Sequence, residues 1–417
     1  MLPSFQPRAK KLFSIGMVSL VALCYLGLAL REFAAAYFAS RLDMNGLQAA
    51  IHLEPANALY QEQLGRVFSI TGDWNAAARA YQTAASLNPY KASAWFNLAS
   101  VYQVSGNLPD QEKALEQAIR ADPRTPDVAW EAANFYLAQG EVDKAFREFR
   151  LAIEGDATKA DAALRLCLRV NPDIDAVMQR VLPSRAIGYI SLLSLLEARH
   201  DTQGAFKAWA ALMGTQQSFE IRYLFEYLKY LLVQHEVDAA QSAWKEAAGK
   251  FGLSAYLPTP ENLIVNPDFS ADILNEPFDW QYNRQAGLAL TLDSTDFHAG
   301  RRSLSITFEG PGISDAGISQ VIPVKPGRKY DFSAFYKAPD IQGAGGPRFS
   351  IQDAYTGASL FLSEELKNYD YWHQTGGDFS SGPETRLVKL GVLRVPDRAA
   401  IRGKLLVGNF RLSEKQQ

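Results

Sequence analysis

The longest uninterrupted apolar stretch of the chain lies near its N-terminus. Residues 12–30 contain no charged side chain over 19 positions, and a helix of that length spans about 28 Å, close to the hydrocarbon core of a bilayer. Three basic residues precede this stretch, whereas an Arg–Glu pair follows it. The pattern predicts a cytoplasmic tail at 1–11 and a transmembrane signal anchor at 12–30. We therefore expect a single-pass protein of the inner (cytoplasmic) membrane, with its C-terminal domains extracytoplasmic or periplasmic.

A cleaved signal peptide and a buried soluble helix are the alternatives. Cleaved signals have an apolar region of roughly 7–15 residues followed by a small-residue site. Ala34-Ala35-Ala36 would supply such a site, but the apolar run is longer than that range and Arg31-Glu32 intervenes. The length of the run favours an uncleaved anchor.

Downstream of the anchor, the same residue types recur every 34 residues. Gly72, Gly106 and Gly140 are spaced in this way. Other positions with the same period are Phe68, Tyr102 and Tyr136; Tyr81, Leu115 and Phe149; Ala84, Ala118 and Ala152; and Pro55, Pro89 and Pro123. Glycine permits the positive φ of a tight turn, alanine lets two helices approach, and proline ends a helix. The period predicts helical hairpins stacked into a solenoid, because one hairpin cannot bury its own apolar face.

This pattern resembles the tetratricopeptide repeat family, with clear repeats over residues 58–157. The resemblance is carried by Leu64-Gly65-Phe68-Ala77-Tyr81-Ala84-Pro89, by Trp95-Leu98-Ala99-Tyr102-Leu115-Ala118-Pro123 and by Ala132-Ala133-Tyr136-Ala145-Phe149-Ala152. Residues 41–55 look like the second half of an earlier repeat. A weaker 35-residue recurrence relates Ala205, Trp209 and Leu212 to Ala240, Trp244 and Ala247. We therefore expect degenerate hairpins up to residue 250, an irregular connection between Pro172 and Pro183, and an all-α solenoid over 41–257.

The resemblance implies a protein partner bound to the concave surface that the first helix of each hairpin forms. The positions of this surface are Glu62, Arg66, Phe96, Asn97, Ser100, Gln103, Trp130 and Asn134. Members of the family that grip a chain terminus use two lysines and an arginine, whereas Glu62, Ser93 or Asp127 holds those places here. Binding of a chain terminus is therefore not expected. Phe96 and Trp130 are the best candidates for an exposed aromatic anchor, and packing inside the solenoid is the alternative for both.

After residue 258 the helical period disappears, and Pro258 and Pro260 mark a linker. Short runs of alternating apolar and polar residues follow, at Asn262–Asn266, Leu288–Leu292, Ser303–Phe308, Ile318–Val324, Tyr330–Lys337, Arg348–Asp353, Leu387–Val395 and Leu405–Leu412. Turns rich in glycine and proline separate the runs. Alternation with a period of two predicts strands that bury one face. Residues 258–417 are therefore expected to form an antiparallel β-sandwich of the jelly-roll type.

Several phrases of this region resemble the galactose-binding-like family of carbohydrate-binding modules. They are Asn262–Phe269, Phe278–Trp280, Gly300–Leu304, Gln320–Gly327, Tyr330–Tyr336 and Gly403–Phe410. The resemblance implies a β-sandwich with a glycan ligand, and it implies that Trp280 and Trp372 lie in the core. The tyrosines expected to be exposed are Tyr282, Tyr355, Tyr369 and Tyr371. The last three form the leading sugar-binding set, because a tyrosine ring stacks on a pyranose while its hydroxyl hydrogen-bonds; packing is the alternative role for each.

Composition excludes several classes of protein. Lys plus Arg is 42 and Asp plus Glu is 45, a net charge of −3, so no basic surplus predicts a nucleic-acid partner. Only Cys24 and Cys167 occur, which excludes a disulfide scaffold and a cysteine-rich metal site. Where calcium-binding members of the resembled family carry acidic residues, this chain has Ser270 and Asn409. We therefore predict no metal site and no cofactor.

The sequence contains no recognisable catalytic motif. A phosphate loop, a Gly-x-Ser-x-Gly elbow and a His-Glu-x-x-His helix are all missing. Glu364 and Glu365 are adjacent and would point to opposite faces of a strand, unlike the facing carboxylates of a glycosidase. We expect a non-enzymatic, membrane-anchored extracytoplasmic scaffold that binds protein partners through its repeats, in envelope polysaccharide assembly or export. The alternative is a carbohydrate-binding module presented on a structural helical stalk.

Overall fold

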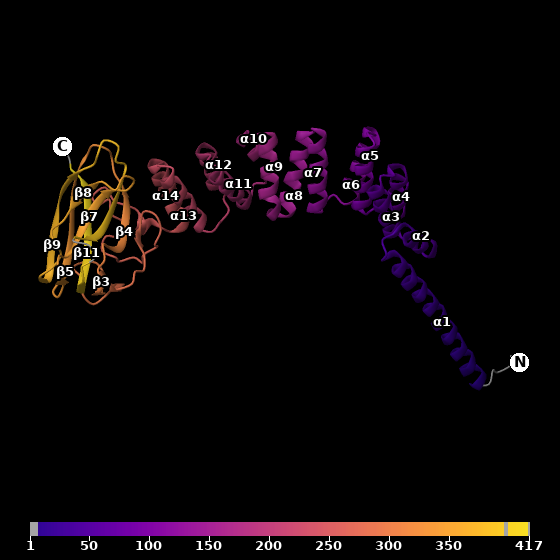
Figure 1. Ribbon diagram of the computed structural model, residues 1–417, viewed down its shortest axis with the longest axis horizontal. Coiled ribbons are helices and arrows are strands. Elements are labelled where there is room, and N and C mark those ends of the chain that lie inside the picture. The colour runs from indigo at the N-terminus through magenta and orange to yellow at the C-terminus, as the bar shows by residue number, and fades with distance from the viewer. Residues whose placement is uncertain (1–6, 396–398, 416–417) are drawn as a thin grey trace. The chain divides into compact units, whose positions relative to one another are not determined.

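The structure is a computed structural model that describes residues 7–395 and 399–415, with side chains from residue 11 onward (Figure 1). The expected cytoplasmic tail, 1–11, therefore lies mostly outside the described residues. The chain divides into two compact units, Met1–Leu195 and Leu196–Gln417.

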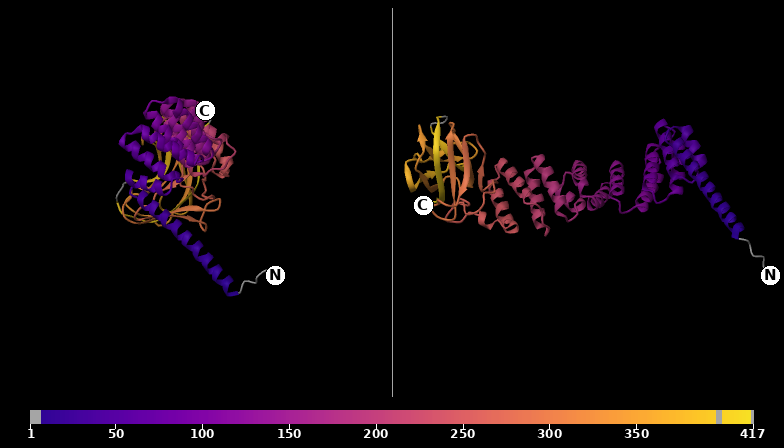
Figure 2. Two further views of the ribbon diagram at one scale, coloured as in Figure 1. Left: turned by 90° about the vertical axis from the view of Figure 1, so that its right-hand side faces the viewer. Right: turned by 90° about the horizontal axis from the view of Figure 1, so that it is seen from below.

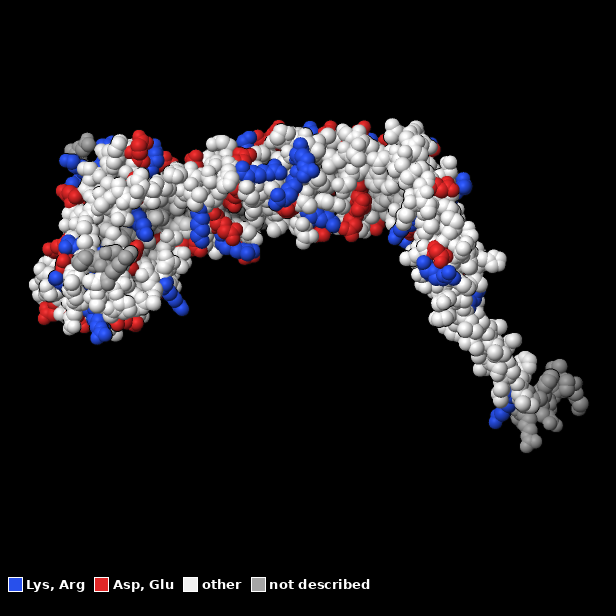
Figure 3. Space-filling view, viewed as in Figure 1, with Lys and Arg blue, Asp and Glu red and all other residues white. Residues whose placement is uncertain are grey.

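The first unit begins with one long apolar helix, α1 (Pro7–Ala39). Its segment Lys11–Ala39 is long and apolar enough to cross a membrane, judged by length and composition, and its most apolar window is not buried by the rest of the protein. Most of this helix shows no charged side chain on the face seen in Figure 3. Ala35 and Ala39, near its end, are buried in a cluster with Leu47 of α2 (Met44–Leu53). The candidate span is thus longer than the expected 12–30.

Helical hairpins continue the first unit after α2. Their helices are α3 (Ala58–Thr71), α4 (Trp74–Leu87), α5 (Ala92–Val104), α6 (Leu108–Ala121), α7 (Pro126–Gln139), α8 (Val142–Gly155), α9 (Ala160–Val170) and α10 (Ile174–Val181), with a 3-10 turn at Ala157–Lys159. The boundary between the two units falls within the next helix, α11 (Ala186–Ala198). Gly72, Gly106 and Gly140 have φ angles of 80°, 73° and 78°, the left-handed values with which glycine terminates a helix. The 34-residue period is therefore the repeat of one helical hairpin.

The first clear hairpin depends on a glycine at its helix–helix contact. A Cβ atom on Gly65 of α3 would lie 2.7 Å from a ring carbon of Tyr81 on α4. The Tyr81 ring is 3% exposed and packs in a cluster with Ala77, Leu98 and Ala99. The small and large positions of the sequence pattern are thus the core of the hairpins, and the expected tetratricopeptide-like solenoid is confirmed.

The stretch between Pro172 and Pro183 is more regular than expected, because it contains the short helix α10. The side chain of Asp173 caps this helix by accepting hydrogen bonds from the backbone N–H groups of Asp175 and Ala176. A carboxylate at the N-cap satisfies donors that the first turn leaves unpaired. The cap therefore stabilises the first turn of α10.

The second unit joins three helices to a β-sandwich. The helices are α12 (Thr202–Gly214), α13 (Arg222–Val233) and α14 (Val237–Phe251), followed by a 3-10 turn at Ser254–Tyr256. The strands are β1 (Trp280–Tyr282), β2 (Leu288–Asp293), β3 (Ser303–Gly310), β4 (Asp315–Pro323), β5 (Lys329–Ala338), β6 (Gln342–Gly343), β7 (Pro347–Asp353), β8 (Ser359–Leu362), β9 (Tyr369–Ser380), β10 (Leu387–Arg394) and β11 (Ile401–Glu414). Helices thus occupy the residues where degenerate hairpins were expected, and α13 packs against α14 within this unit.

Two antiparallel sheets form the sandwich, and their layers are visible in Figures 1 and 2. One sheet has the order β1-β4-β10-β7-β8, and the other has the order β2-β3-β11-β5-β9, with β6 also paired to β11. The short β1 and the strand β2 are thus edge strands, and so are β8 and β9. The expected all-α solenoid followed by an antiparallel β-sandwich is confirmed.

The strand predictions fail at several places: the short strands β1, β6 and β8 lie outside the predicted runs, and two further differences are larger. β9 was not predicted, because its burial does not alternate regularly and Gly376-Gly377 interrupts it. Residues 262–266 do not form a named strand; Leu263 donates a hydrogen bond to Leu412 O, and Asn262 makes one isolated bridge to Thr259. Edge positions with polar side chains on both faces weaken the alternation on which such predictions depend.

The sandwich core contains one of the two tryptophans expected there. Trp280 is 2% exposed, its ring lies 4.8 Å from that of Phe410, and its Nε1 donates to Asn266 O. Trp372 is only partly buried, and its Nε1 donates to Asp296 Oδ1. The core assignment is thus confirmed for Trp280 and wrong for Trp372, which β9 carries outside the packed layer.

Helices α13 and α14 pack on the sandwich within the second unit. Lys229 of α13 pairs with Glu276 at 2.6 Å, and Asp238 of α14 pairs with Arg386 at 3.1 Å. The Trp244 ring of α14 lies 6.3 Å from that of Phe278. Apolar contact and ion pairs together join the last hairpin to the sheet that contains β4 and β10.

Candidate functional site

The predicted partner surface of the repeats contains two rows of residues with the 34-residue spacing. One row is Glu62, Phe96 and Trp130, and the other is Arg66, Ser100 and Asn134. Within each helix the two rows are four residues apart, so they lie on the same side of the helix. The two rows differ in burial: the Glu62 row is largely buried, whereas the Arg66 row is largely exposed.

Glu62 is enclosed by a polar network that links α3 to α5. Its side chain is 6% exposed, and its carboxylate accepts hydrogen bonds from Lys91 Nζ at 2.6 Å, Ser93 Oγ at 3.0 Å and Asn97 Nδ2 at 3.3 Å. The hydrogen-bonding capacity of this carboxylate is therefore used between repeats. Asn97, which was also predicted at the partner surface, belongs to the same network.

The two aromatic positions of this row also make contacts inside the solenoid. Phe96 is 8% exposed, and its ring stacks on that of Phe135 with centroids 5.8 Å apart. Trp130 is partly buried, lies edge-on to Phe149 at 5.3 Å, and has Lys159 Nζ 5.8 Å from its ring. Only the Trp130 ring retains a face partly open to solvent.

The second row lies at the surface. Arg66 and Ser100 are exposed, and Asn134 is partly buried with its Nδ2 donating to Trp130 O. Gln103, one helical turn beyond Ser100, is exposed as well. Four of the predicted partner-binding residues therefore present atoms to solvent along α3, α5 and α7.

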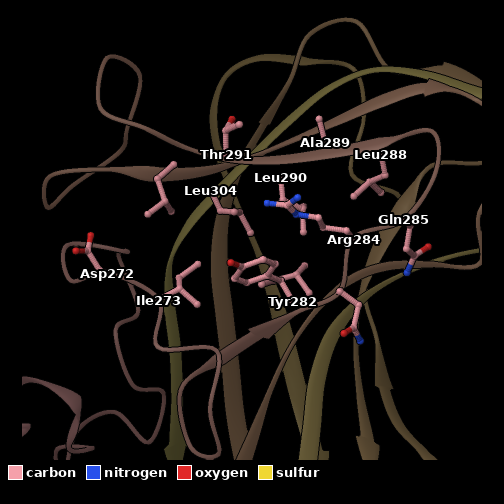
Figure 4. Close-up of a pocket in the computed structure, with 13 residues that line it drawn as sticks. Asp272, Ile273, Tyr282, Arg284, Gln285, Leu288, Ala289, Leu290, Thr291 and Leu304 are labelled. Atoms are coloured by element: carbon pink, nitrogen blue, oxygen red, sulfur yellow. The ribbon is translucent and has the colours of Figure 1, made fainter.

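A cleft of about 570 Å³ opens at one edge of the β-sandwich, where β1 and β2 are the edge strands of the two sheets (Figure 4). Its lining consists of Asp272, Ile273, Tyr282, Asn283, Arg284, Gln285, Leu288, Ala289, Leu290, Thr291, Leu292, Leu304 and Ile318. A volume of roughly 300–1,000 Å³ with an apolar lining and a few polar groups is typical of small-ligand sites.

The apolar wall of the cleft follows from the alternation of β2. Leu288, Leu290 and Leu292 pair with residues of β3 that are buried in the core, and they pack against the core from its margin. Alternate residues of a strand share one face, so these leucines all point between the two sheets. Because β1 has only three residues, the opposite sheet leaves them partly uncovered.

Polar side chains surround this wall. The Tyr282 side chain projects into the cleft and is 37% exposed (Figure 4). Arg284 is exposed, lines the cleft together with Leu290, and has no hydrogen bond or ion pair in the part of the chain that the structure describes (Figure 4). Asp272 lies at the opposite end and is paired with Arg302 at 2.9 Å. The cleft thus contains one exposed aromatic ring and one unpaired cation.

The sequence gives little indication of this cleft. Tyr282 was expected to be exposed, but Arg284 and the β2 leucines were not predicted as site residues. The alternation of 288–292 predicts only that one face is buried. That the face is partly open depends on the short β1, which belongs to a distant pairing with β4.

The structure brings two of the three predicted sugar-binding tyrosines together on β9. The Tyr369 ring lies edge-on to Tyr371 at 5.6 Å and stacks on His373 at 3.9 Å. Tyr371 is 60% exposed, whereas Tyr336, beneath Tyr369, is fully buried. Burial raises the pKa of the Tyr336 phenol, and its hydroxyl has no partner among the described residues. Tyr371 is therefore the accessible ring of this row.

Tyr355 makes contacts of another kind. Its ring stacks on His235 at 3.9 Å, and its hydroxyl donates to Leu232 O at 2.9 Å. These partners belong to α13 and to the turn that follows it. Tyr355 therefore lies in the junction between the last helical hairpin and the sandwich, although 36% of it remains exposed.

Comparison with family models identifies both parts of the chain. Residues 63–114 and 101–163 match the Tetratricopeptide repeat model, and residues 261–392 match the Carbohydrate binding domain model. Both families are non-catalytic. In the described residues, no group of three or more His, Cys, Asp or Glu side chains is arranged to hold a metal ion.

Solved structures resemble the separate parts. One, reported as CBM4 structure and function, is 16% identical over 36% of this chain and 99% of its own, with a TM-score of 0.29. The CBM22-1 xylan-binding domain of Paenibacillus barcinonensis Xyn10C is 14% identical over 36% of this chain and 92% of its own, with a TM-score of 0.26. PilW, a type IV pilus biogenesis factor, is 16% identical over 47% of this chain and 94% of its own, with a TM-score of 0.26. No curated protein matches the chain.

Proposed function

We propose that this chain, which joins tetratricopeptide repeats to a carbohydrate binding domain, is a non-enzymatic scaffold anchored in the inner membrane by α1. Its repeats would bind a protein partner, and its C-terminal domain would hold an envelope polysaccharide during assembly or export. The observation that carries the proposal is the match of residues 261–392 to a carbohydrate binding domain in a chain that also contains helical repeats.

The proposed location rests on α1. A helix that is apolar over Lys11–Ala39 and not covered by the rest of the protein is stable in the hydrocarbon core of a bilayer. The basic residues before it favour a cytoplasmic N-terminus. With that orientation, the repeats and the sandwich would lie on the side of the membrane where envelope polysaccharides are assembled.

The proposed partner surface is the exposed row Arg66, Ser100 and Asn134, extended by Gln103 and by the open face of Trp130. The guanidinium, hydroxyl and amide groups of these side chains can form hydrogen bonds with the backbone of a peptide. A partly exposed tryptophan is often a residue that contributes strongly to protein–protein binding. Glu62, Phe96 and Asn97 would support this surface from within the solenoid.

The proposed sugar-binding surface on β9 is Tyr371 with Tyr369. Tyr371 carries the exposed ring. Its neighbour Tyr369 is held in place by stacking on His373. A rigid aromatic face buries the C–H face of a pyranose at a low cost in conformational entropy. Tyr355 remains a predicted member of this set, although its hydroxyl is already bonded to α13.

The second candidate is a carbohydrate-binding domain on a stalk that binds no protein. The enclosed network around Glu62 favours it, because three partners use that carboxylate between repeats. A purely structural solenoid needs such contacts and needs no free surface. Variants of the exposed row distinguish the two candidates.

The test uses the full chain in detergent micelles and in its native host. Mobility in gels that contain neutral or acidic polysaccharides measures carbohydrate binding, and site-specific photo-crosslinking from the exposed position Gln103 captures protein partners. The scaffold predicts crosslinks that the Arg66→Glu, Ser100→Arg double variant abolishes, together with retardation by polysaccharide. Retardation without crosslinks supports the stalk. A chain that is retarded by no polysaccharide contradicts both.

A further inference from the structure

The cation at the edge cleft has no assigned role in the proposed scaffold. Arg284 is exposed and unpaired in the described chain, and it lines the same cleft as the β2 leucines (Figure 4). The other charged side chain of the cleft lining, Asp272, is paired with Arg302. The guanidinium of Arg284 is thus available to an external anion.

The geometry of a guanidinium determines which anion it recognises best. Its planar fork donates two parallel hydrogen bonds to a carboxylate or a phosphate, and it remains charged at every physiological pH. Next to an apolar wall the local dielectric constant is lower than in water, which strengthens such a contact. The group expected at Arg284 is therefore an anionic group that belongs to a partly apolar ligand.

The rest of the lining separates a sugar from an aliphatic chain. Six of the thirteen lining residues have polar side chains, namely Asp272, Tyr282, Asn283, Arg284, Gln285 and Thr291. An acyl chain would displace water from these groups and offer no hydrogen bonds in return, which is costly. A pyranose has an apolar C–H face and a hydroxyl rim, so it satisfies both the leucine wall and the polar groups. The lining therefore favours a sugar.

We propose that the cleft between β1 and β2 binds a uronic acid unit of an anionic polysaccharide. Arg284 pairs with the carboxylate, and Tyr282 contacts the face of the pyranose ring above the β2 leucines. The inference rests on the proposed function, because it presupposes that the domain binds a polysaccharide. It adds that the polysaccharide is acidic and that a second surface recognises it.

Two features of the domain are compatible with an anionic ligand at this position. Asp272 is the one acidic side chain that lines the cleft, and it is paired with Arg302 and lies at the end away from Arg284. In the sheet order β2-β3-β11-β5-β9, the cleft and Tyr371 are at opposite edges. A polysaccharide bound in the cleft can therefore leave the Tyr371 surface accessible.

The test compares two ligands that share one sugar backbone, one with free carboxylates and one with neutral methyl esters. Hexagalacturonate and its methyl ester are titrated into the full chain in detergent micelles, using Arg284→Gln, the control variant Arg411→Gln and the unmodified chain. Arg411 is an exposed arginine of β11 that does not line the cleft. We expect the acid to bind the unmodified chain about tenfold more tightly than the ester, a typical gain for one charge-assisted pair. Arg284→Gln removes this difference and Arg411→Gln keeps it, while the melting temperatures of all three proteins agree.

The outcomes separate the inference from the proposed function. Equal affinity of acid and ester, or an unchanged preference in Arg284→Gln, overturns the uronate site while neutral polysaccharide binding can persist. If no neutral or acidic saccharide binds at all, the proposed function fails first and the inference fails with it. Displacement of hexagalacturonate by decanoate, with an affinity that Arg284→Gln weakens, would show that the occupant is an aliphatic anion and would overturn the sugar assignment.

Discussion

Glu62 of α3 and Lys91, which immediately precedes α5, form an ion pair with 2.6 Å between Oε2 and Nζ. The two residues are in successive hairpins, so the pair joins one repeat to the next. The glutamate side chain is 6% exposed and the lysine side chain is 37% exposed. The carboxylate of the pair is thus buried, whereas the lysine is partly exposed to solvent.

Replacing Glu62 should loosen the first repeats. Glu62→Ala leaves Ser93 and Asn97 without their acceptor in a largely buried site. Losing these hydrogen bonds should lower the free energy of unfolding by about 1–3 kcal/mol. Hydrogen exchange of α3 and α5 in the full chain measures the local opening. Arg66→Ala, at an exposed position one turn further along α3, is the control and should leave the exchange unchanged. Equal protection in both variants would contradict the structural role of the network.

One substitution should have opposite effects at two glycines. Gly65→Ala places a Cβ 2.7 Å from the Tyr81 ring, and the forced repacking should destabilise the first unit by about 1–3 kcal/mol. Gly249 of α14 has open space around its Cβ position, so Gly249→Ala should stabilise the second unit by about 0.5–1 kcal/mol through helix propensity. Urea denaturation followed by far-UV circular dichroism measures both. Destabilisation by Gly249→Ala would contradict the described environment of α14.

The helical part of the fold was predictable because its period repeats. Each occurrence of glycine at 72, 106 and 140 indicates the same turn, so three weak signals support one another. The strands 303–308 and 330–337 were predictable because each buries alternate residues against the opposite sheet. β9 escaped prediction because it is an edge strand whose Tyr371 and Gln374 face solvent.

The candidate sites were less predictable, since they depend on contacts between distant segments. Sequence identifies Arg66 and Ser100 as equivalent repeat positions, but it does not show that Glu62 is consumed by Lys91 from the next hairpin. An arginine such as Arg284 is common in a turn, and whether an acidic residue neutralises it is decided by the tertiary fold. From the sequence, Tyr355 is expected to be an exposed loop residue. Its contacts with Leu232 and His235 become apparent only in the folded chain.

Asp279 should make the second unit less stable as the pH rises through the acidic range. The residue is fully buried, Leu274 N donates to its Oδ2, and its Oδ1 has no partner among the described residues. Burial raises the pKa of its carboxyl from 3.8 to about 6. The unfolded chain then ionises at a lower pH than the folded chain, so stability falls between about pH 4 and 6 and stays reduced above pH 6.

Asp279→Asn tests this pH dependence, because the amide keeps an acceptor and removes the charge. We expect the variant to be more stable than the unmodified chain by about 1–3 kcal/mol at pH 7.5 and nearly equal to it at pH 4. Thermal unfolding followed by tryptophan fluorescence at both pH values provides the comparison. Asp370→Asn, on the exposed part of β9, should change neither value. A difference between variant and unmodified chain that is the same at both pH values would show that the charge of Asp279 is not responsible.

Tyr371 and Tyr355 should respond differently to truncation, since one ring faces solvent and the other is bound to α13. Tyr371→Ala should weaken neutral polysaccharide binding by a few-fold to tenfold, equivalent to about 0.5–1.5 kcal/mol, and leave the melting temperature unchanged. Tyr355→Ala removes the stack on His235 and the hydrogen bond to Leu232 O, and should lower stability by about 1–2 kcal/mol. Gel retardation and calorimetry on the same samples measure the two effects. Loss of binding in Tyr355→Ala at unchanged stability would return Tyr355 to the sugar-binding set and place that site at the junction with the last helical hairpin.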